Sequence, residues 1–148
     1  MLLQNNDSVL PLELSTTRSS GGIALIGPNA AAGMTQLGNY HGLPAELIDI
    51  QTGLSNLVGS GTRVSYAQGC TIGGSADPES IAEAVLLVSG GEKPAAVVLV
   101  LGLDGTQEAE GQDRHSLALP GAQLQLAVAV SAAAKARSPP VSVIVVVM

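Results

Sequence analysis

Four short runs of apolar, mostly β-branched residues alternate along the chain with three longer stretches in which apolar residues recur at helical spacing. We predict strands at Gly22–Gly27, Arg63–Gly69, Ala95–Leu103 and Val141–Met148. The first, third and fourth runs are almost continuously apolar, which is typical of parallel strands covered on both faces. The second run alternates apolar and polar residues, so we expect it nearer an edge of the sheet.

The intervening stretches, Pro44–Gly59, Asp77–Gly91 and Pro120–Ser138, are predicted helices. The second has the clearest start, because Asp77 can cap its first turn and Pro78 occupies the first helical position. The strands and helices alternate from one end to the other. This order predicts an α/β fold, a mostly parallel sheet with helices on both faces in a three-layer α/β/α sandwich.

The last predicted strand, Val141–Met148, is followed by no turn and no polar residue. A strand this apolar is expected in the centre of a sheet, with neighbours on both sides. We therefore expect the sheet to be truncated and the chain to be a fragment of a larger protein.

Composition supports one folded domain with a core built from Val, Leu, Ile and Ala. The 148 residues are 46% apolar and 12% charged, with two Tyr and no Trp or Phe. The net charge of -6 argues against a nucleic-acid partner, because the chain lacks a basic patch to neutralise phosphates. No apolar run reaches the roughly 18 residues of a membrane span, so no membrane partner is expected. The chain carries no targeting signal from which a compartment could be assigned.

Cys70 is the only cysteine, which excludes an internal disulfide and any site with several thiolate ligands. Beside a predicted strand, a lone cysteine is expected to be a small buried hydrophobe rather than a reactive thiol.

Ligands of parallel sheets bind beyond the carboxyl ends of the strands, and two loops lie there. The first, "GPNAAAGMTQLGNYHG", contains glycines but no G-x-G-x-x-G or Gly-Lys-Ser/Thr spacing. A flavodoxin-like nucleotide or phosphate binder is therefore disfavoured. His41 in this loop is expected to be solvated rather than a ligand.

The second loop is acidic. Asp104, Glu108, Glu110 and Asp113 follow the third predicted strand directly and make up a third of the chain's twelve acidic residues. Their spacing matches no EF-hand and no other familiar metal site. In one interpretation the loop is a solvated turn, with Asp113 and Arg114 at the surface. In the other, one Glu is a general acid whose pKa is raised where a partner surface closes over it.

Five sequence blocks in register resemble glycoside hydrolase family 3. They are "LLQNNDSVLPL", "IALIGPNA", "LGNYHGLP", "VSYAQGC" and "EAEGQDRHSLALPGAQ". Together they resemble the start of that family's C-terminal α/β-sandwich domain, and "EAEG-x-DR" is similar to its β-xylosidase-like members. By this resemblance, residues 1–148 are a partial C-terminal domain without the family's catalytic barrel.

The resemblance implies a retaining, exo-acting β-glycosidase that needs no cofactor and no metal. Its substrate would be a β-linked oligosaccharide or an aryl glycoside. Retention requires two carboxyl groups about 5 to 5.5 Å apart. The family's nucleophilic Asp comes from the N-terminal barrel domain, and its acid/base Glu comes from the loop matched here by the acidic residues. Family members are often secreted.

By motif position Glu108 is the expected acid/base, with Glu110 as the alternative. Asp113 and Arg114 are expected to shape the loop through an ion pair or to lie on the substrate side. Tyr40 and His41 match another family loop, and packing is their expected role.

Without a barrel, the isolated chain is expected to be inactive, and the intact enzyme to be β-xylosidase-like or β-glucosidase-like. The alternative is a non-catalytic interaction or carbohydrate-binding domain that retains the fold. Sugar-binding modules usually bind the apolar face of the sugar on a platform of aromatic side chains. This chain has only two tyrosines and no Trp or Phe, which disfavours the alternative.

Overall fold

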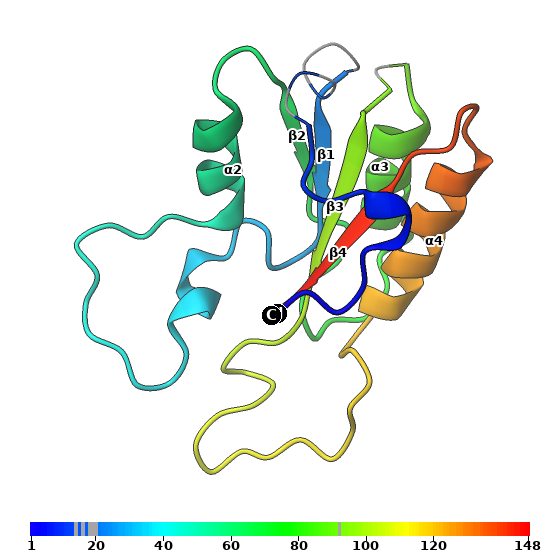
Figure 1. Cartoon of the computed structure of the whole chain (residues 1–148). Coiled ribbons are helices and arrows are strands. Elements are labelled where there is room, and N and C mark those ends of the chain that lie inside the picture. The colour runs from blue at the N-terminus through cyan, green and yellow to red at the C-terminus, as the bar shows by residue number, and fades with distance from the viewer. Residues whose placement is uncertain (14, 16, 18–20, 92) are drawn as a thin grey trace.

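The computed structural model describes residues 1–13, 15, 17, 21–91 and 93–148. Its centre is a four-stranded sheet in the order β2-β1-β3-β4, in which every neighbouring pair is parallel (Figure 1). The strands are β1 (Ile23–Ile26), β2 (Val64–Ala67), β3 (Ala96–Leu101) and β4 (Val143–Val147). All four predicted strands are therefore confirmed, each slightly shorter than its apolar run.

The sheet is flanked by the helices α2 (Ile50–Val58), α3 (Pro78–Ser89) and α4 (Gln123–Ala136). In Figure 1, α3 and α4 cover one face of the sheet and α2 lies on the other. Two short 3₁₀ helices are also described, η1 (Asn6–Ser8) and η2 (Gly33–Leu37). The predicted three-layer α/β/α arrangement is confirmed.

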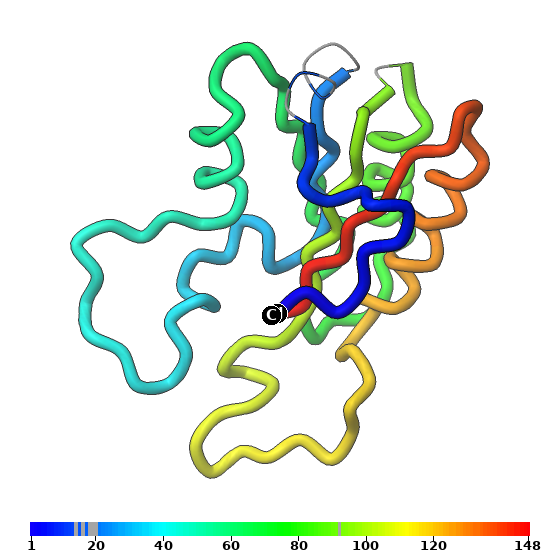
Figure 2. The backbone as a smooth tube through the Cα atoms, viewed as in Figure 1, coloured from blue at the N-terminus to red at the C-terminus, as the bar shows by residue number. Residues whose placement is uncertain are grey.

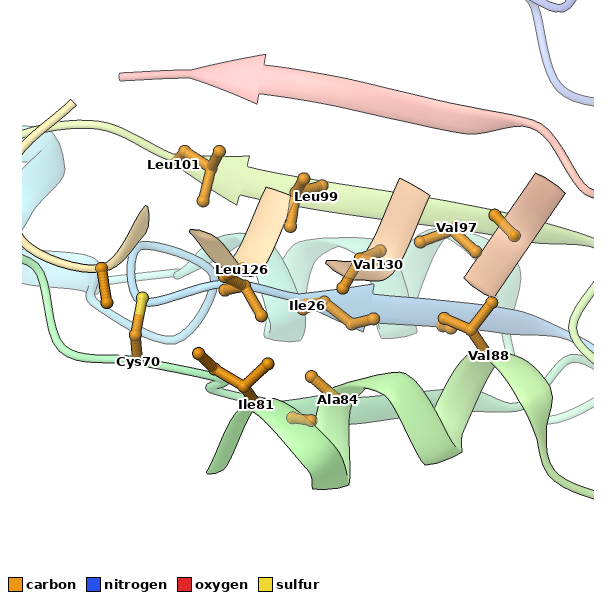
Figure 3. Packing of buried hydrophobic residues seen from close by; sticks show 14 residues of the cluster. Ile26, Cys70, Ile81, Ala84, Val88, Val97, Leu99, Leu101, Leu126 and Val130 are labelled. Carbon is orange, nitrogen blue, oxygen red and sulfur yellow. The ribbon is translucent and has the colours of Figure 1, made fainter. Parts of the chain in front are cut away.

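Two apolar clusters, one on each face of the sheet, form the core. On the face of α3 and α4, Leu126 and Val130 pack between Ile81 and the sheet residues Ile26 and Leu99 (Figure 3). The smaller cluster on the other face joins strand residues to α2 and consists of Ile23, Leu25, Ala30, Val58, Val98 and Val100. β1 and β3 are buried on both faces, which explains their continuous apolar sequences.

The first predicted helix begins six residues too early. Residues 44–49 are not helical, and Asp49 caps α2 by accepting a hydrogen bond of 2.6 Å from the Thr52 N–H. An aspartate side chain can accept hydrogen bonds from nearby backbone N–H groups, which favours it at the N-cap over a position inside the helix. The apolar residues Leu47 and Ile48, which extended the helical pattern, are exposed in the preceding loop.

The position of β4 agrees with the expectation of a truncated sheet. β4 pairs with β3 and forms one edge of the described sheet, with Val145 54% and Val147 67% exposed, so this apolar strand lacks a second neighbour among the described residues. β3 pairs with β1 on one side and β4 on the other. β2 forms the opposite edge, as its alternating sequence predicted.

The parallel strands place the loops after β1, β2 and β3 at the same end of the sheet. The tube in Figure 2 shows the cyan loop after β1 and the yellow loop after β3 both projecting beyond this end. The yellow segment is the acidic loop, residues 102–122, which leads from β3 into α4. The fold thus brings the two candidate loops to one edge.

Candidate functional site

The acidic loop leaves the sheet at Gly102, which the buried amide of Gln123 clamps. The Gly102 N–H donates to Gln123 Oε1 at 2.8 Å, and Gln123 Nε2 donates to the Gly102 carbonyl at 2.8 Å. The same Nε2 donates to the Ile72 carbonyl at 2.9 Å, in the loop after β2. Gln123 is fully buried at the start of α4. One side chain therefore joins β3, α4 and the loop after β2.

Asn29, from the loop after β1, holds the next residue of the acidic loop. Its Nδ2 donates to the Leu103 carbonyl at 3.0 Å, and its side chain is fully buried. The turn that delivers Asn29 begins at Gly27, where φ is +126° and an added Cβ would lie 2.0 Å from the Val100 carbonyl oxygen. Only glycine fits there. We call Gly102 and Leu103, with Gln123 and Asn29, the loop root.

Beyond the root, the loop is shaped by its own polar groups. Asp104 Oδ1 accepts hydrogen bonds from the Thr106 N–H at 2.9 Å and the Thr106 hydroxyl at 2.6 Å. The Asp104 carbonyl accepts from the backbone N–H of Gln107 at 3.0 Å and of Glu108 at 3.2 Å. Asp104 thus closes a local turn that fixes the backbone just before Glu108.

The next turn places Glu110 at its tip. Two backbone hydrogen bonds join Ala109 and Gln112, at 3.1 and 2.9 Å, and enclose Glu110 and Gly111. Gly111 has a φ of +76°, which glycine adopts without strain. The Gln112 amide also donates to the Thr106 carbonyl at 2.6 Å, which ties this turn to the previous one. We call residues 104–114 the loop tip.

The structure separates the two candidate carboxylates. Glu108 lines a pocket of about 270 Å³ together with Arg114, His115, Ser116 and Leu117. Glu110 is not among the residues that line this pocket, and its carboxylate raises the pKa of the Tyr40 hydroxyl in the loop after β1. Both carboxylates are exposed, and Glu108 is the one that lines the pocket.

Arg114 and Asp113 do not behave as expected. The Arg114 guanidinium donates to the Ala118 carbonyl, and in the described part of the chain no ion pair joins it to Asp113. Asp113 is exposed and Arg114 half-buried. The contact of Arg114 is consistent with a part in shaping the loop, although a different one from the expected ion pair.

The loop after β1 also differs from its prediction. Tyr40 is 81% exposed, so its expected packing role within this chain is wrong. His41 is also exposed, with its Nδ1 3.1 Å from the Gly38 carbonyl oxygen, which agrees with a solvated loop residue and contradicts the packing role expected from the family loop. Cys70 is 4% exposed, and burial raises the pKa of its thiol, which confirms the structural interpretation.

The sequence analysis did not identify Gln123 and Asn29 as structural residues, although the sequence contains an indication of each. The buried face of α4 consists of Gln123, Leu126, Val130 and Ala134, so an amide stands in an otherwise apolar stripe. A buried polar group requires hydrogen-bond partners, which marks such a position as structural. Asn29 lies three residues after the buried strand β1, at the carboxyl end of the sheet where ligands of parallel sheets bind.

A larger pocket, of about 340 Å³, lies at the opposite end of the sheet. It is lined at the start of β1 and β2 and the end of α3, by residues that include Arg63, Glu83 and Leu86. Its position at the amino ends of the strands is not where parallel sheets bind ligands. We therefore place the candidate site at the acidic loop despite the smaller volume there.

Among the described residues, no three His, Cys, Asp or Glu side chains gather closely enough to hold a metal ion. Within the same residues, every helix is too short or too polar to cross a membrane. Chemically, the acidic loop offers a carboxylate that can exchange a proton with a ligand in the pocket, and basic and hydroxyl groups beside it that can form hydrogen bonds.

Comparison with known proteins relates the chain to glycoside hydrolases. It is 40% identical over 126 residues to "Beta-D-xylosidase 3" of Arabidopsis thaliana, a match that covers 85% of this chain and 15% of that protein. It is 36% identical over 132 residues to "Beta-xylosidase" of Formosa agariphila, covering 85% of this chain and 17% of that protein. The chain thus spans about a sixth of the length of these relatives.

Solved structures agree with this relationship. A GH3 exo-β-xylosidase in complex with a xylobiose aziridine activity-based probe superposes with a TM-score of 0.77 and 30% identity, over 95% of this chain and 16% of that one. The GH3 β-glucosidase of Bifidobacterium adolescentis superposes with a TM-score of 0.78 and 31% identity, over 99% of this chain and 19% of that one. The family model for the glycosyl hydrolase family 3 C-terminal domain matches residues 1–148, so the chain belongs to glycosyl hydrolase family 3 and represents its C-terminal domain.

Proposed function

We propose that this chain supplies the general acid/base of a retaining β-glycosidase, with Glu108 as the proton donor and acceptor. The observation that carries the proposal is the separation of the two carboxylates. Glu108 lines a pocket together with Arg114, His115 and Ser116, whereas Glu110 is not among the residues that line it. The names of the relatives, β-xylosidases and β-glucosidases, favour a β-linked oligosaccharide or aryl glycoside as substrate.

In this mechanism Glu108 gives its proton to the glycosidic oxygen as the bond to the sugar breaks. An aspartate of the N-terminal barrel domain attacks the anomeric carbon and forms the glycosyl-enzyme. Glu108 then takes a proton from water, which hydrolyses that intermediate with overall retention. No cofactor is required. The loop root keeps the acidic loop at a constant position while its tip reaches across the boundary between the domains.

The isolated chain is expected to be inactive because it contributes one carboxyl group of the required pair. The barrel supplies the nucleophile and the floor of the sugar site, and it determines whether xylose or glucose is preferred. The resemblance to secreted family members favours an extracellular location for the intact enzyme.

The test is hydrolysis of p-nitrophenyl β-xyloside and β-glucoside by three proteins. They are the chain alone, the chain joined to a family barrel, and the joined protein with Glu108→Ala. We expect activity only in the joined protein, a loss on the order of 10² to 10⁴-fold in the variant, and partial recovery with azide. Azide acts as a small nucleophile that needs no general base and so restores the second step.

The matched control is Glu110→Ala in the same joined protein. A loss rescued by azide in this variant, with Glu108→Ala fully active, would move the acid/base role to Glu110. A well-folded joined protein without any activity would favour a non-catalytic interaction domain.

A further inference from the structure

The pocket beside Glu108 contains a positive charge for which the described residues provide no counter-ion. Arg114 lines this pocket and is half-buried, and its guanidinium donates a hydrogen bond to the neutral carbonyl of Ala118. Among the described residues, no aspartate or glutamate lies within ion-pair distance of the guanidinium, Glu108 included. A charge that is partly removed from water is stabilised by an opposite charge beside it, so this pocket is suited to an anion.

Two neighbours of Arg114 add hydrogen-bond donors to the same pocket. The His115 ring carries at least one N–H in every protonation state, and the Arg114 guanidinium has N–H groups beyond the one that binds Ala118. Ser116 Oγ accepts from the Ala118 N–H at 3.1 Å, which leaves its hydroxyl hydrogen for a ligand. A carboxylate accepts several hydrogen bonds at once, and a guanidinium can bind it with two parallel N–H···O bonds. This set of donors fits a carboxylate better than a neutral hydroxyl group.

The segment that carries these donors is held by its own hydrogen bonds. The bond from Arg114 to the Ala118 carbonyl and the bond from the Ala118 N–H to Ser116 both lie within residues 114–118. Leu117, in the same segment, lines the pocket and is 102% exposed. An apolar side chain at this position can pack against the apolar face of a sugar or an aryl ring. The pocket thus combines donors for a carboxylate with an apolar surface for the ring that carries it.

The role of Glu108 places this pocket on the leaving-group side of the scissile bond. A general acid protonates the glycosidic oxygen, which departs with the leaving group, whereas the nucleophile attacks the anomeric carbon from the opposite side. Residues 114–117 share the pocket with Glu108 and therefore lie beside the leaving group. As the acid, Glu108 carries its proton when the glycoside binds, so it is neutral at that stage and does not repel an anion held by Arg114.

We propose that Arg114, together with His115 and Ser116, forms a subsite for a leaving group that carries a carboxylate, such as a uronic acid or an aryl carboxylate. The inference rests on the proposed function of Glu108 and extends it to the chemistry of the leaving group. Arg114 is thereby a specificity-determining residue, in addition to its contact with the Ala118 carbonyl.

The kinetic test uses the barrel-joined enzyme and two β-xylosides that differ only in charge. Their leaving groups are 3-carboxy-4-nitrophenol and its carboxamide, 3-carbamoyl-4-nitrophenol. Arg114→Gln should lower kcat/KM for the carboxylate about tenfold more than for the carboxamide. Comparison of each variant with the parent enzyme on both substrates cancels the intrinsic reactivity of the leaving groups. An equal loss for both substrates would mean that Arg114 only shapes the loop or pairs with the barrel, and would overturn the inference.

Two further variants separate the charge of Arg114 from its shape and its position. Arg114→Lys retains the charge without the planar fork, so it should keep part of the selectivity for the carboxylate. The control Lys135→Gln removes one exposed positive charge near the end of α4, outside the pocket, and should leave both rates unchanged. A loss of carboxylate selectivity in Lys135→Gln equal to that in Arg114→Gln would indicate a long-range effect of net charge and contradict a subsite.

Ionic strength provides an independent check of the electrostatic contribution. Added salt screens charges at an exposed site, so it should reduce the carboxylate-to-carboxamide ratio of the parent enzyme. The ratio of Arg114→Gln should stay constant, because the interacting charge is absent. A parent ratio that does not respond to salt would contradict an ionic contact.

Binding can also be measured in the 148-residue chain without a barrel. D-glucuronate and its neutral analogue D-glucuronamide are titrated into the chain, and the backbone amide signals of residues 114–117 are followed by NMR. We expect glucuronate to shift these signals more than glucuronamide does, and Arg114→Gln to abolish the difference. Equal responses to the two sugars, or no response to either, would overturn the subsite.

The two proposals fail in different ways. If Glu108→Ala is fully active, the proposed acid/base is wrong, while the NMR titration still decides whether Arg114 binds a carboxylate. If Glu108→Ala behaves as expected but Arg114→Gln affects both substrates equally, the subsite is wrong and the acid/base proposal stands.

Discussion

The root and the tip of the acidic loop are held by opposite means. At the root, buried amides bind backbone groups of Gly102 and Leu103 across elements that are far apart in sequence. At the tip, the hydrogen bonds at Asp104 and between Ala109 and Gln112 are local and exposed to water. The chain therefore determines rigidly where the loop leaves the sheet, and holds the carboxylates beyond it much more weakly.

This difference has a physical basis in the cost of unpaired groups. A buried donor or acceptor that loses its partner costs about 1 to 3 kcal/mol, because no water replaces the partner. An exposed group that loses its partner binds water instead, so that the net loss is small. Changes at the root should alter global stability, and changes at the tip should alter local order and activity.

Gln123→Leu should have the largest effect on stability. It leaves the Gly102 N–H and the carbonyls of Gly102 and Ile72 without their amide partner, so we expect a loss of about 3 kcal/mol. Urea unfolding followed by circular dichroism measures it. The control is Gln125→Leu, an exposed position of the same helix, which should change stability by less than about 0.5 kcal/mol. Similar results for the two variants would contradict the clamp.

Asn29→Ala should come next, with a loss of about 1 to 2 kcal/mol. It removes one hydrogen bond, from Nδ2 to the Leu103 carbonyl. It also removes Oδ1, a buried acceptor that has no partner in the described structure, and this offsets part of the loss. The same unfolding assay should show almost no change for Asn39→Ala, an exposed position of the same loop. A loss as large as that of Gln123→Leu would mean that Oδ1 has an important partner.

Gly111→Ala should cost less than about 1 kcal/mol in global stability. The added Cβ meets no atom within 4 Å, so its cost is the strain of alanine at a φ of +76°, which an exposed turn can relax. The change should appear as faster hydrogen exchange at the Ala109 and Gln112 amides. Gly105→Ala, where the Cβ also enters open space without a positive φ, should leave both amides unchanged. Equal exchange in the two variants would contradict a strained turn.

Asp77 offers the mildest test, at the exposed start of α3. Its hydrogen bonds, first with the Ser80 hydroxyl and then with the Glu79 N–H, lower the pKa of its carboxyl. The stabilisation is therefore present above the unfolded pKa, near 3.9, and is lost as the pH falls through the lower folded pKa. Thermal melts of Asp77→Ala should lie below those of the parent at pH 6 and converge with them in acid. A constant difference down to low pH would indicate that the charge is not responsible.

Much of the fold could be predicted because its signals are local. The continuous apolar runs of β1 and β3 follow from burial on both faces, and Asp77 with Pro78 marks the start of α3 from their own backbone preferences. The start of α2 was predicted too early because Leu47 and Ile48 continue the apolar pattern while Asp49 caps the helix behind them. The apolar pattern and the capping residue thus indicate different starts for this helix, and the helix begins after the capping residue Asp49.

By itself, the sequence determined the alternation of strands and helices and the concentration of acidic residues directly after β3, because both depend on residues close together in the chain. Tertiary structure alone decided that Gln123 clamps the loop root and that Asn29, from the loop after β1, binds the Leu103 carbonyl. These features are contacts between segments far apart in sequence. Apolar periodicity shows which face of an element is buried, but it does not show which neighbour buries that face or which polar partner lies beside it.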